Sequence, residues 1–213
     1  MWLVKLGGSL QESPHLGNWL RLLADRGGGR LIVVPGGGRF ADAVRAAQER
    51  WGFDNITAHH MALIAMEQYG RMLAGMEPRL RPVGDRNGLL RAIDQNEVPV
   101  WMPSIMAGRE QSIPASWEMT SDSLSLWLAI ELGAELLAVV KSVTPARGEY
   151  DLRRLVSAGW LDPQFPRFAE RFRGDIAWFG CDETDAFARA LSQERLPDNH
   201  LIQGARTLDP EAA

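Results

Sequence analysis

An apolar run that ends in three consecutive glycines places the strongest constraint on how this chain folds. Residues 31–35 (LIVVP) have the composition of a buried strand, and Gly36, Gly37 and Gly38 follow at once. Apolar residues then recur at helical spacing over about 39–50. Glycines at such a turn supply positive φ, or let a ligand approach bare N–H groups beside the positive end of a helix dipole. A tight turn without a ligand is the alternative, but three glycines in a row favour an anion site, most often for phosphate.

Apolar runs alternate with amphipathic segments of helical length along the whole chain. The expected strands are 2–6, 31–35, 98–103, 136–141, 176–180 and about 200–203. The expected helices are 14–26, 39–50, 56–76 with an interruption at Gly70, 86–95, 120–132, 151–157, 164–172 and 183–194. This alternation predicts an α/β sandwich with a mainly parallel sheet. Segments 104–119 and 142–150 show little periodicity and are expected to be functional loops.

Composition excludes several classes of protein. The 213 residues suffice for one large domain, and the formal charge of −4 with no basic stripe argues against a nucleic-acid partner. A single cysteine, Cys181, allows no intrachain disulfide and fits a reducing compartment. No apolar run approaches the roughly 20 residues of a membrane span, and the first residues lack the apolar core of a signal peptide. We therefore expect a cytoplasmic protein with no membrane association.

Polar residues and glycines gather where the predicted strands end. In parallel sheets, ligands bind at the carboxyl ends of the strands. The residues delivered there are Lys5, Gly7-Gly8-Ser9, Gly36-Gly37-Gly38-Arg39 and Lys141-Ser142, together with Thr120-Ser121-Asp122-Ser123 at the start of a helix. Two glycine turns, two lysines and one carboxylate together predict a site for a highly charged phosphate chain.

Other known site motifs do not account for these residues. The P-loop pattern is absent. Gly36-x-Gly38-x-x-Ala41 satisfies the loose dinucleotide fingerprint, but no acidic residue ends a strand about 20 residues later. One cysteine and the adjacent His59 and His60 do not make a zinc site, and the G-x-S-x-G motif of serine hydrolases is missing.

Three stretches resemble the amino-acid kinase superfamily: VKLGGSL, VPGGGRFAD and TSDSLSLWLAIELGAELLAVVKSV. The resemblance covers about residues 2–204 in the right order and spacing. It implies a three-layer αβα sandwich, ATP with Mg²⁺, and phosphoryl transfer to a carboxylate or a phosphate. It further implies a single kinase-like domain over 1–213, with an acceptor-binding half at about 1–115 and a nucleotide-binding half at about 116–207.

Two further stretches narrow the acceptor. Together with GGGRFADAVR, they are similar to an archaeal and methylotroph branch that includes the kinase for [5-(aminomethyl)furan-3-yl]methyl phosphate, which makes a diphosphate in methanofuran biosynthesis; the two stretches are TAHHMALIAMEQYGRMLAG and DLRRLVSAGWLDPQF. Isopentenyl-phosphate kinases usually carry a histidine just after the glycine run, and Phe40-Ala41-Asp42 contains none. Acetylglutamate and aspartate kinases are generally longer.

The chain departs from the superfamily after the 136–141 strand. Many members have T-D-V-D-G-V-Y there, whereas residues 141–147 read KSVTPAR. Two alternatives therefore stay open. One is a non-catalytic subunit of the same fold that binds a nucleotide or an oxyanion, and the other is a kinase for another phosphate or carboxylate acceptor.

The resemblance, taken with the charges, predicts a role for each site residue. Lys5 and Lys141 neutralise the transferred group and the leaving ADP, and Asp122 holds both ammonium groups in place. The residues expected at the nucleotide phosphates are Gly7, Gly8, Ser9 and Ser142. The residues expected at the acceptor are Gly36, Gly37, Gly38, Arg39, His59 and His60. No metal ligand is assigned, and family habit predicts a homodimer or a higher homo-oligomer.

Overall fold

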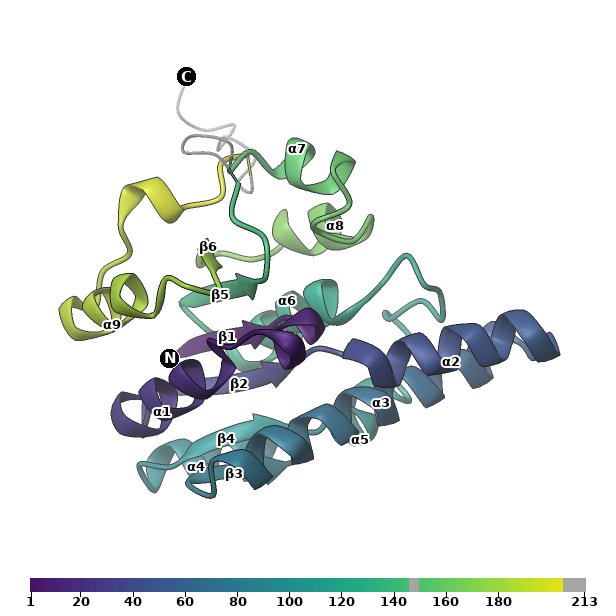
Figure 1. Cartoon of the computed structure of the whole chain (residues 1–213), viewed down its shortest axis with the longest axis horizontal. Helices are drawn as coiled ribbons and strands as arrows, with labels where there is room; N and C mark the ends of the chain where they lie inside the picture. The colour runs from purple at the N-terminus through teal and green to yellow at the C-terminus, as the bar shows by residue number, and fades with distance from the viewer. Residues whose placement is uncertain (146–149, 205–213) are drawn as a thin grey trace.

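A six-stranded sheet forms the centre of the molecule, in the order β3-β4-β2-β1-β5-β6 (Figure 1). The strands are β1 Trp2–Leu6, β2 Leu31–Pro35, β3 Leu80–Val83, β4 Val98–Trp101, β5 Leu136–Lys141 and β6 Asp175–Gly180. Neighbouring strands pair in parallel throughout. This structure is a computed structural model and describes residues 1–145 and 150–204. Residues 146 and 147 of the altered segment, and 205–207 of the expected nucleotide half, lie outside that range.

Helices cover both faces of the sheet. One face packs against α1 (Leu16–Arg26), α3 (Asn55–Met76) and α9 (Thr184–Gln193). The other packs against α4 (Arg86–Asp94), α6 (Ser121–Leu132), α7 (Leu152–Ser157) and α8 (Phe165–Ala169). The remaining helices are α2 (Gly38–Trp51), α5 (Ser104–Ala107) and the 3₁₀ turns η1 (Gly8–Glu12) and η2 (Asp198–His200). The expected three-layer αβα sandwich is thus confirmed.

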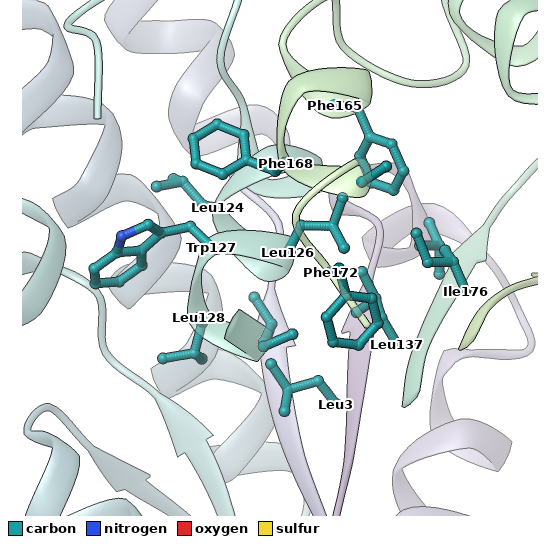
Figure 2. Close-up of a cluster of buried hydrophobic side chains, with 14 of the residues drawn as sticks. Leu3, Leu124, Leu126, Trp127, Leu128, Leu137, Phe165, Phe168, Phe172 and Ile176 are labelled. Carbon is teal, nitrogen blue, oxygen red and sulfur yellow. The ribbon is translucent and has the colours of Figure 1, made fainter. Parts of the chain in front are cut away.

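Alternation along the strands decides which face each side chain meets. In β1, Leu3 enters the core under α6, whereas Val4 enters the core on the opposite face (Figure 2). Side chains an even number of positions apart in a strand point to the same face of the sheet. Lys5 therefore shares a face with Leu3, and Lys141 shares a face with Leu137 in the neighbouring β5. Both lysines therefore lie on the face of the sheet that α6 covers.

The helix α3 runs unbroken through Gly70, so the expected interruption there is wrong. A Cβ at Gly70 would lie 2.5 Å from Met102 and 3.2 Å from Pro35. The glycine therefore lets the helix approach the sheet closely, and it does not end the helix. The α2–α3 pair extends beyond the sheet edge (Figure 1).

The structure differs from the sequence-based expectation at two further elements, one strand that is absent and one that was not expected. Residues 200–203 form no strand: η2 ends there, and Leu201 makes only an isolated bridge to Ala177. Conversely, the edge strand β3 was not expected, because Arg81 and Pro82 are exposed and break the apolar pattern. Among the described residues, no helix is long and apolar enough to cross a membrane.

Candidate active site

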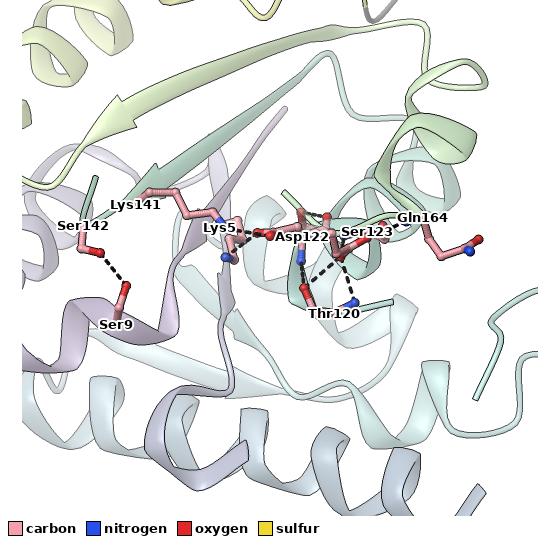
Figure 3. A network of polar contacts seen from close by, with 10 residues as sticks. Lys5, Ser9, Thr120, Asp122, Ser123, Lys141, Ser142 and Gln164 are labelled. Atoms are coloured by element: carbon pink, nitrogen blue, oxygen red, sulfur yellow. Dashed lines mark hydrogen bonds and ion pairs between the residues drawn. The ribbon is translucent and has the colours of Figure 1, made fainter. Parts of the chain in front are cut away.

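Lys5, Asp122 and Lys141 form a buried ion-pair triad at the carboxyl end of the sheet (Figure 3). Lys5 Nζ lies 2.5 Å from Asp122 Oδ1, and Lys141 Nζ donates to Asp122 Oδ2 over 2.6 Å. Lys5 and Asp122 are 2% and 4% exposed. One carboxylate thus holds two ammonium groups side by side, which is the arrangement that the sequence predicted for these three residues.

Burial and mutual charge set the protonation of the triad. Burial of Lys5, together with the positive charge of Lys141, lowers the pKa of its ammonium from 10.5 to about 8, although Asp122 acts in the opposite direction. Burial alone would raise the pKa of Asp122, but Lys141 and Lys5 together hold it below its usual value. At neutral pH the triad is therefore fully charged and carries one net positive charge.

A second buried carboxylate, Asp162, secures the start of α6. Its Oδ2 accepts from the backbone N and the Oγ1 of Thr120, at 2.9 and 2.8 Å, and from Ser123 N at 3.0 Å. Its Oδ1 accepts from Ser123 Oγ and from Gln164 N. These bonds satisfy amides at the N-terminus of the helix that carries Asp122.

The two glycine turns pack backbone against backbone. A Cβ on Gly8 would lie 2.2 Å from the nitrogen of Gly38, and a Cβ on Gly36 would lie 2.3 Å from the nitrogen of Gly8. Gly38 also has φ +54. Part of the glycine requirement therefore comes from the contact between the turns, which the sequence alone did not reveal.

A cleft of about 560 Å³ opens above the triad. The expected site residues that line it are Lys5, Gly8, Ser9, Gly37, Gly38, Arg39, His59, Asp122 and Lys141. They come from β1, the glycine turns, the N-terminal parts of α2 and α3, α6 and β5. The structure therefore gathers most of the expected residues around one space.

Four expected residues are absent from the cleft wall. The N–H of Gly7 donates to Val140 O and that of Gly36 to Leu6 O, both over 2.9 Å, so neither amide points to a ligand. Ser142 shares a hydrogen bond of 2.8 Å with Ser9 and stands just outside the lining. His60 is exposed, in contrast to His59, whose pKa burial lowers.

The wall formed by α2 carries charges of both signs. Arg39 pairs with Glu12, and Arg45 Nη1 lies 3.9 Å from Asp42 Oδ1. The Arg45 guanidinium also stacks on Trp117, 4.5 Å from the ring centroid. Met66, Met119 and other apolar residues complete this end of the cleft. It can therefore receive a ligand with an apolar body and charged groups.

Sequence reasoning missed Arg45, Trp117 and Asp162. One available signal would have strengthened the prediction of the triad: the chain contains 21 arginines but only two lysines, Lys5 and Lys141. Arginine serves as the cation everywhere else, whereas the compact ammonium is kept at the two positions that contact Asp122.

No metal site can be assigned to side chains. Among residues 1–145 and 150–204, no group of three His, Cys, Asp or Glu residues is placed to hold an ion. Both oxygens of Asp122 are already paired with lysines. A metal ion here would depend on ligand atoms brought by a substrate.

Comparisons with known proteins identify the family of this chain. The model of the amino acid kinase family matches residues 1–144. The [5-(aminomethyl)furan-3-yl]methyl phosphate kinase of Methanocaldococcus jannaschii is 28% identical over 152 residues, which are 71% of this chain and 68% of that protein.

Solved structures share the fold. Uridylate kinase from Archaeoglobus fulgidus superposes with a TM-score of 0.69 at 13% identity, covering 94% of this chain and 97% of that one. UMP kinase from Bacillus anthracis gives a TM-score of 0.68 at 18% identity, covering 94% and 93%. With the family model matching well over half of the chain, this protein belongs to the amino acid kinase family and is a phosphotransferase.

Proposed function

We propose that this kinase transfers the γ-phosphoryl group of ATP to a phosphomonoester, giving a diphosphate, and that [5-(aminomethyl)furan-3-yl]methyl phosphate is the acceptor. The observation that carries the reaction class is the buried Lys5–Asp122–Lys141 triad at the base of an open cleft. The likeness to the Methanocaldococcus jannaschii enzyme supports this acceptor.

The protein's contribution to the reaction is positioning and charge stabilisation. Bound ATP supplies the phosphoryl group, and Mg²⁺, held by its phosphates, neutralises part of their charge. Lys5 and Lys141 offset the negative charge on the transferred group and on the departing ADP, and Asp122 keeps both ammonium groups aimed inward. An acceptor phosphate oxygen is already ionised near neutral pH, so its attack on phosphorus needs no general base.

The two ends of the cleft suit different substrates. We assign the nucleotide to the half at about 116–207 together with Gly8 and Ser9, and the acceptor to the α2–α3 wall within 1–115. At that wall Arg39 and Arg45 are cations for a phosphate, and Asp42 is a carboxylate for an ammonium group. An aminomethylfuran phosphate carries both of these charges on an apolar ring.

ADP release in the presence of magnesium and ATP tests the proposal directly. The panel contains the aminomethylfuran phosphate, the same phosphate without its amine, uridine monophosphate, isopentenyl phosphate, aspartate and acetylglutamate. We expect turnover of the first compound, weaker turnover of the second, and a smaller difference between the two in Asp42→Asn. If a different member of the panel is turned over instead, the proposed acceptor is wrong and that compound takes its place. ATP binding without ADP release from any of them would favour the non-catalytic alternative.

We also propose a cytoplasmic homodimer. The single cysteine fits a reducing compartment. Large exposed apolar side chains on and beside the α2–α3 pair, Trp51, Ile56 and Ile64, support an interface between copies.

A further inference from the structure

Asp162 is a buried carboxylate that touches neither lysine and takes no part in the proposed reaction. It is 6% exposed and lies between α7 and α8, 39 positions after Ser123 in the chain. A buried ionised group is costly unless it is paired or fully hydrogen-bonded. The presence of a buried carboxylate next to the triad therefore calls for a physical explanation.

All the hydrogen bonds that the structure gives the Asp162 carboxylate are ones that it accepts. Three come from backbone amides, those of Thr120, Ser123 and Gln164, and two come from the hydroxyls of Thr120 and Ser123. A carboxylate that only accepts is satisfied in its ionised form. The contacts thus describe an anion, although burial and the nearby Asp122 charge raise its pKa.

The contacts also connect Asp162 to Asp122 through one side chain. Thr120 Oγ1 donates to Asp162 Oδ2 over 2.8 Å and accepts from the backbone N of Asp122 over 3.3 Å. On the far side of Asp122 lie the two lysines. Hydrogen bonds and ion pairs therefore connect Asp162 to Thr120, Thr120 to Asp122, and Asp122 to the two lysines.

The charge of the triad gives a second reason for a buried carboxylate at this position. The triad alone has two ammonium groups and one carboxylate, so it holds one uncompensated positive charge before any phosphate binds. Asp162 supplies the second negative charge in the buried set. It also occupies the positive end of α6, whose Thr120 and Ser123 amides would otherwise be free to bind an anion.

We propose that Asp162 is a positioning residue for phosphoryl transfer: it fixes the start of α6 so that Asp122 holds both lysines, and its negative charge balances the net positive charge of the triad in the empty site. This deepens the proposed function, since it concerns the same site. It does not depend on which acceptor is used.

The two-lysine composition allows a test on the enzyme without substrate. Protein labelled with ¹³C at lysine Cε gives two lysine signals, from Lys5 and Lys141, which Lys5→Arg and Lys141→Arg assign. The groups that face Lys5 are Asp122 from α6 and Lys141 from β5. The other titratable or charged groups of the cleft wall are Glu12, Arg39, Asp42, Arg45 and His59. We expect Lys5 to titrate near pH 8 in the unmodified protein.

Asp162→Asn is the informative variant. Its amide oxygen can keep the bonds from Thr120 and Ser123 N, and its NH₂ can donate to Ser123 Oγ, so the variant loses the charge and the bond from Gln164 N. Because an anion favours the ammonium form, we expect the Lys5 midpoint to fall by about half a pH unit or more. Asp85→Asn is the matched control: Asp85 caps α4 through Gly88 N, and its loss should leave the Lys5 midpoint unchanged.

A helix cap without a catalytic role would give a different result. The Tm of Asp162→Asn would fall while the Lys5 midpoint stayed where it is in the unmodified protein, and that outcome overturns the proposal. A second measurement holds even if the variant does not fold. In the unmodified protein both lysine signals should show a small inflection above pH 3.8, where Asp162 takes up its proton before Asp122 does. Absence of this inflection also contradicts the proposal.

Kinetics supply the last readout once an acceptor is turned over. We expect Asp162→Asn to lower kcat about tenfold with little change in KM, because outer-shell partners usually cost about 10- to 100-fold. Asp85→Asn should retain its kcat. An unchanged kcat in Asp162→Asn would contradict the positioning role, whereas failure of every acceptor would leave the lysine titration as a valid test.

Discussion

At the scale of single residues, the proposed function depends on Asp122, a carboxylate at the place where we propose that phosphates bind. Like charges repel, so its presence is explained by the two lysines that it holds at 2.5 and 2.6 Å. Each lysine has about four rotatable bonds and would otherwise sample many positions. Asp122 removes that freedom before a substrate arrives.

Asp122→Asn should therefore fold and bind ATP but turn over at least about 100-fold more slowly, a loss of at least about 2.7 kcal/mol of transition-state stabilisation. If Asp122 acted only on the helix dipole, the variant would lose roughly 0.3–1 kcal/mol of stability and keep its rate. Initial rates of ADP release, compared with the Tm of the same preparation, distinguish the two. A rate within a few-fold of the unmodified enzyme would remove Asp122 from the site.

The lowered pKa of Lys5 makes nucleotide binding depend on pH. A phosphate beside Lys5 favours its ammonium form, so binding raises its pKa above the value of about 8 in the free protein. The affinity for ATP should therefore be independent of this group well below pH 8. Above pH 8 it should fall by up to about tenfold per pH unit until the pKa of the bound state is reached.

Calorimetry in buffers with different ionisation heats should detect proton uptake when ATP binds between pH 8 and 9. Lys5→Arg should lose this uptake, because the guanidinium stays charged. Proton release in that range would show that another group controls binding.

At the scale of helices and strands, buried strands and well-capped helices could be predicted from the sequence. β1, β2 and β5 agree with their expected ranges, and α6 ends at Gly133, which has φ +65. β3 could not be predicted, because an edge strand does not need two apolar faces. Gly70 was misread because the close approach of Met102 is a tertiary contact that no local pattern reports.

The candidate site divides in the same way. The sequence predicts that Lys5 and Lys141 lie in the site, because both stand at the ends of predicted strands. It also predicts Asp122, because the Thr-Ser-Asp-Ser pattern marks the start of a helix. Asp162 lies in a turn, and its contacts with Thr120 and Ser123 span about 40 positions of sequence, so local periodicity gives no sign of it. Nor does the sequence report that the amides of Gly7 and Gly36 are used by the sheet.

The packing of the two glycine turns leads to a prediction about stability. A Cβ in Gly8→Ala would meet the backbone of Gly38 at 2.2 and 2.5 Å, and backbone cannot move aside as a flexible side chain can. We expect a loss of about 1–3 kcal/mol in the free energy of unfolding, together with weaker ATP binding. Gly17→Ala, in α1 with nothing within 4 Å, should be neutral or stabilising by up to about 1 kcal/mol. Denaturant titration of both variants checks this, and equal stabilities would refute the close-packing argument.

At the scale of the whole molecule, the site joins segments that are far apart in the chain. Lys5 lies in the first strand and Ser9 follows it, whereas Asp122, Lys141 and Ser142 belong to the later part of the chain. The Ser9–Ser142 hydrogen bond and the ion pairs of Asp122 connect the two. The site is therefore complete only when the whole sheet has formed, and loss of the fold and loss of the site should coincide.

The distribution of lysines across the molecule gives the last prediction. Because both lysines of the chain lie in the triad, a mild reagent specific for amines can modify lysine only inside the site. Lys5 should react first near pH 8, where its lowered pKa supplies the neutral amine, although its burial slows access. Reductive methylation followed by peptide mass spectrometry should therefore show modification of Lys5 and Lys141 that parallels the loss of ADP release, besides any reaction at the chain's amino terminus. Saturating ATP should protect both lysines and leave the amino terminus reactive, which serves as an internal control. Protection of neither lysine would place the nucleotide away from the triad and would contradict the proposed orientation of the substrates.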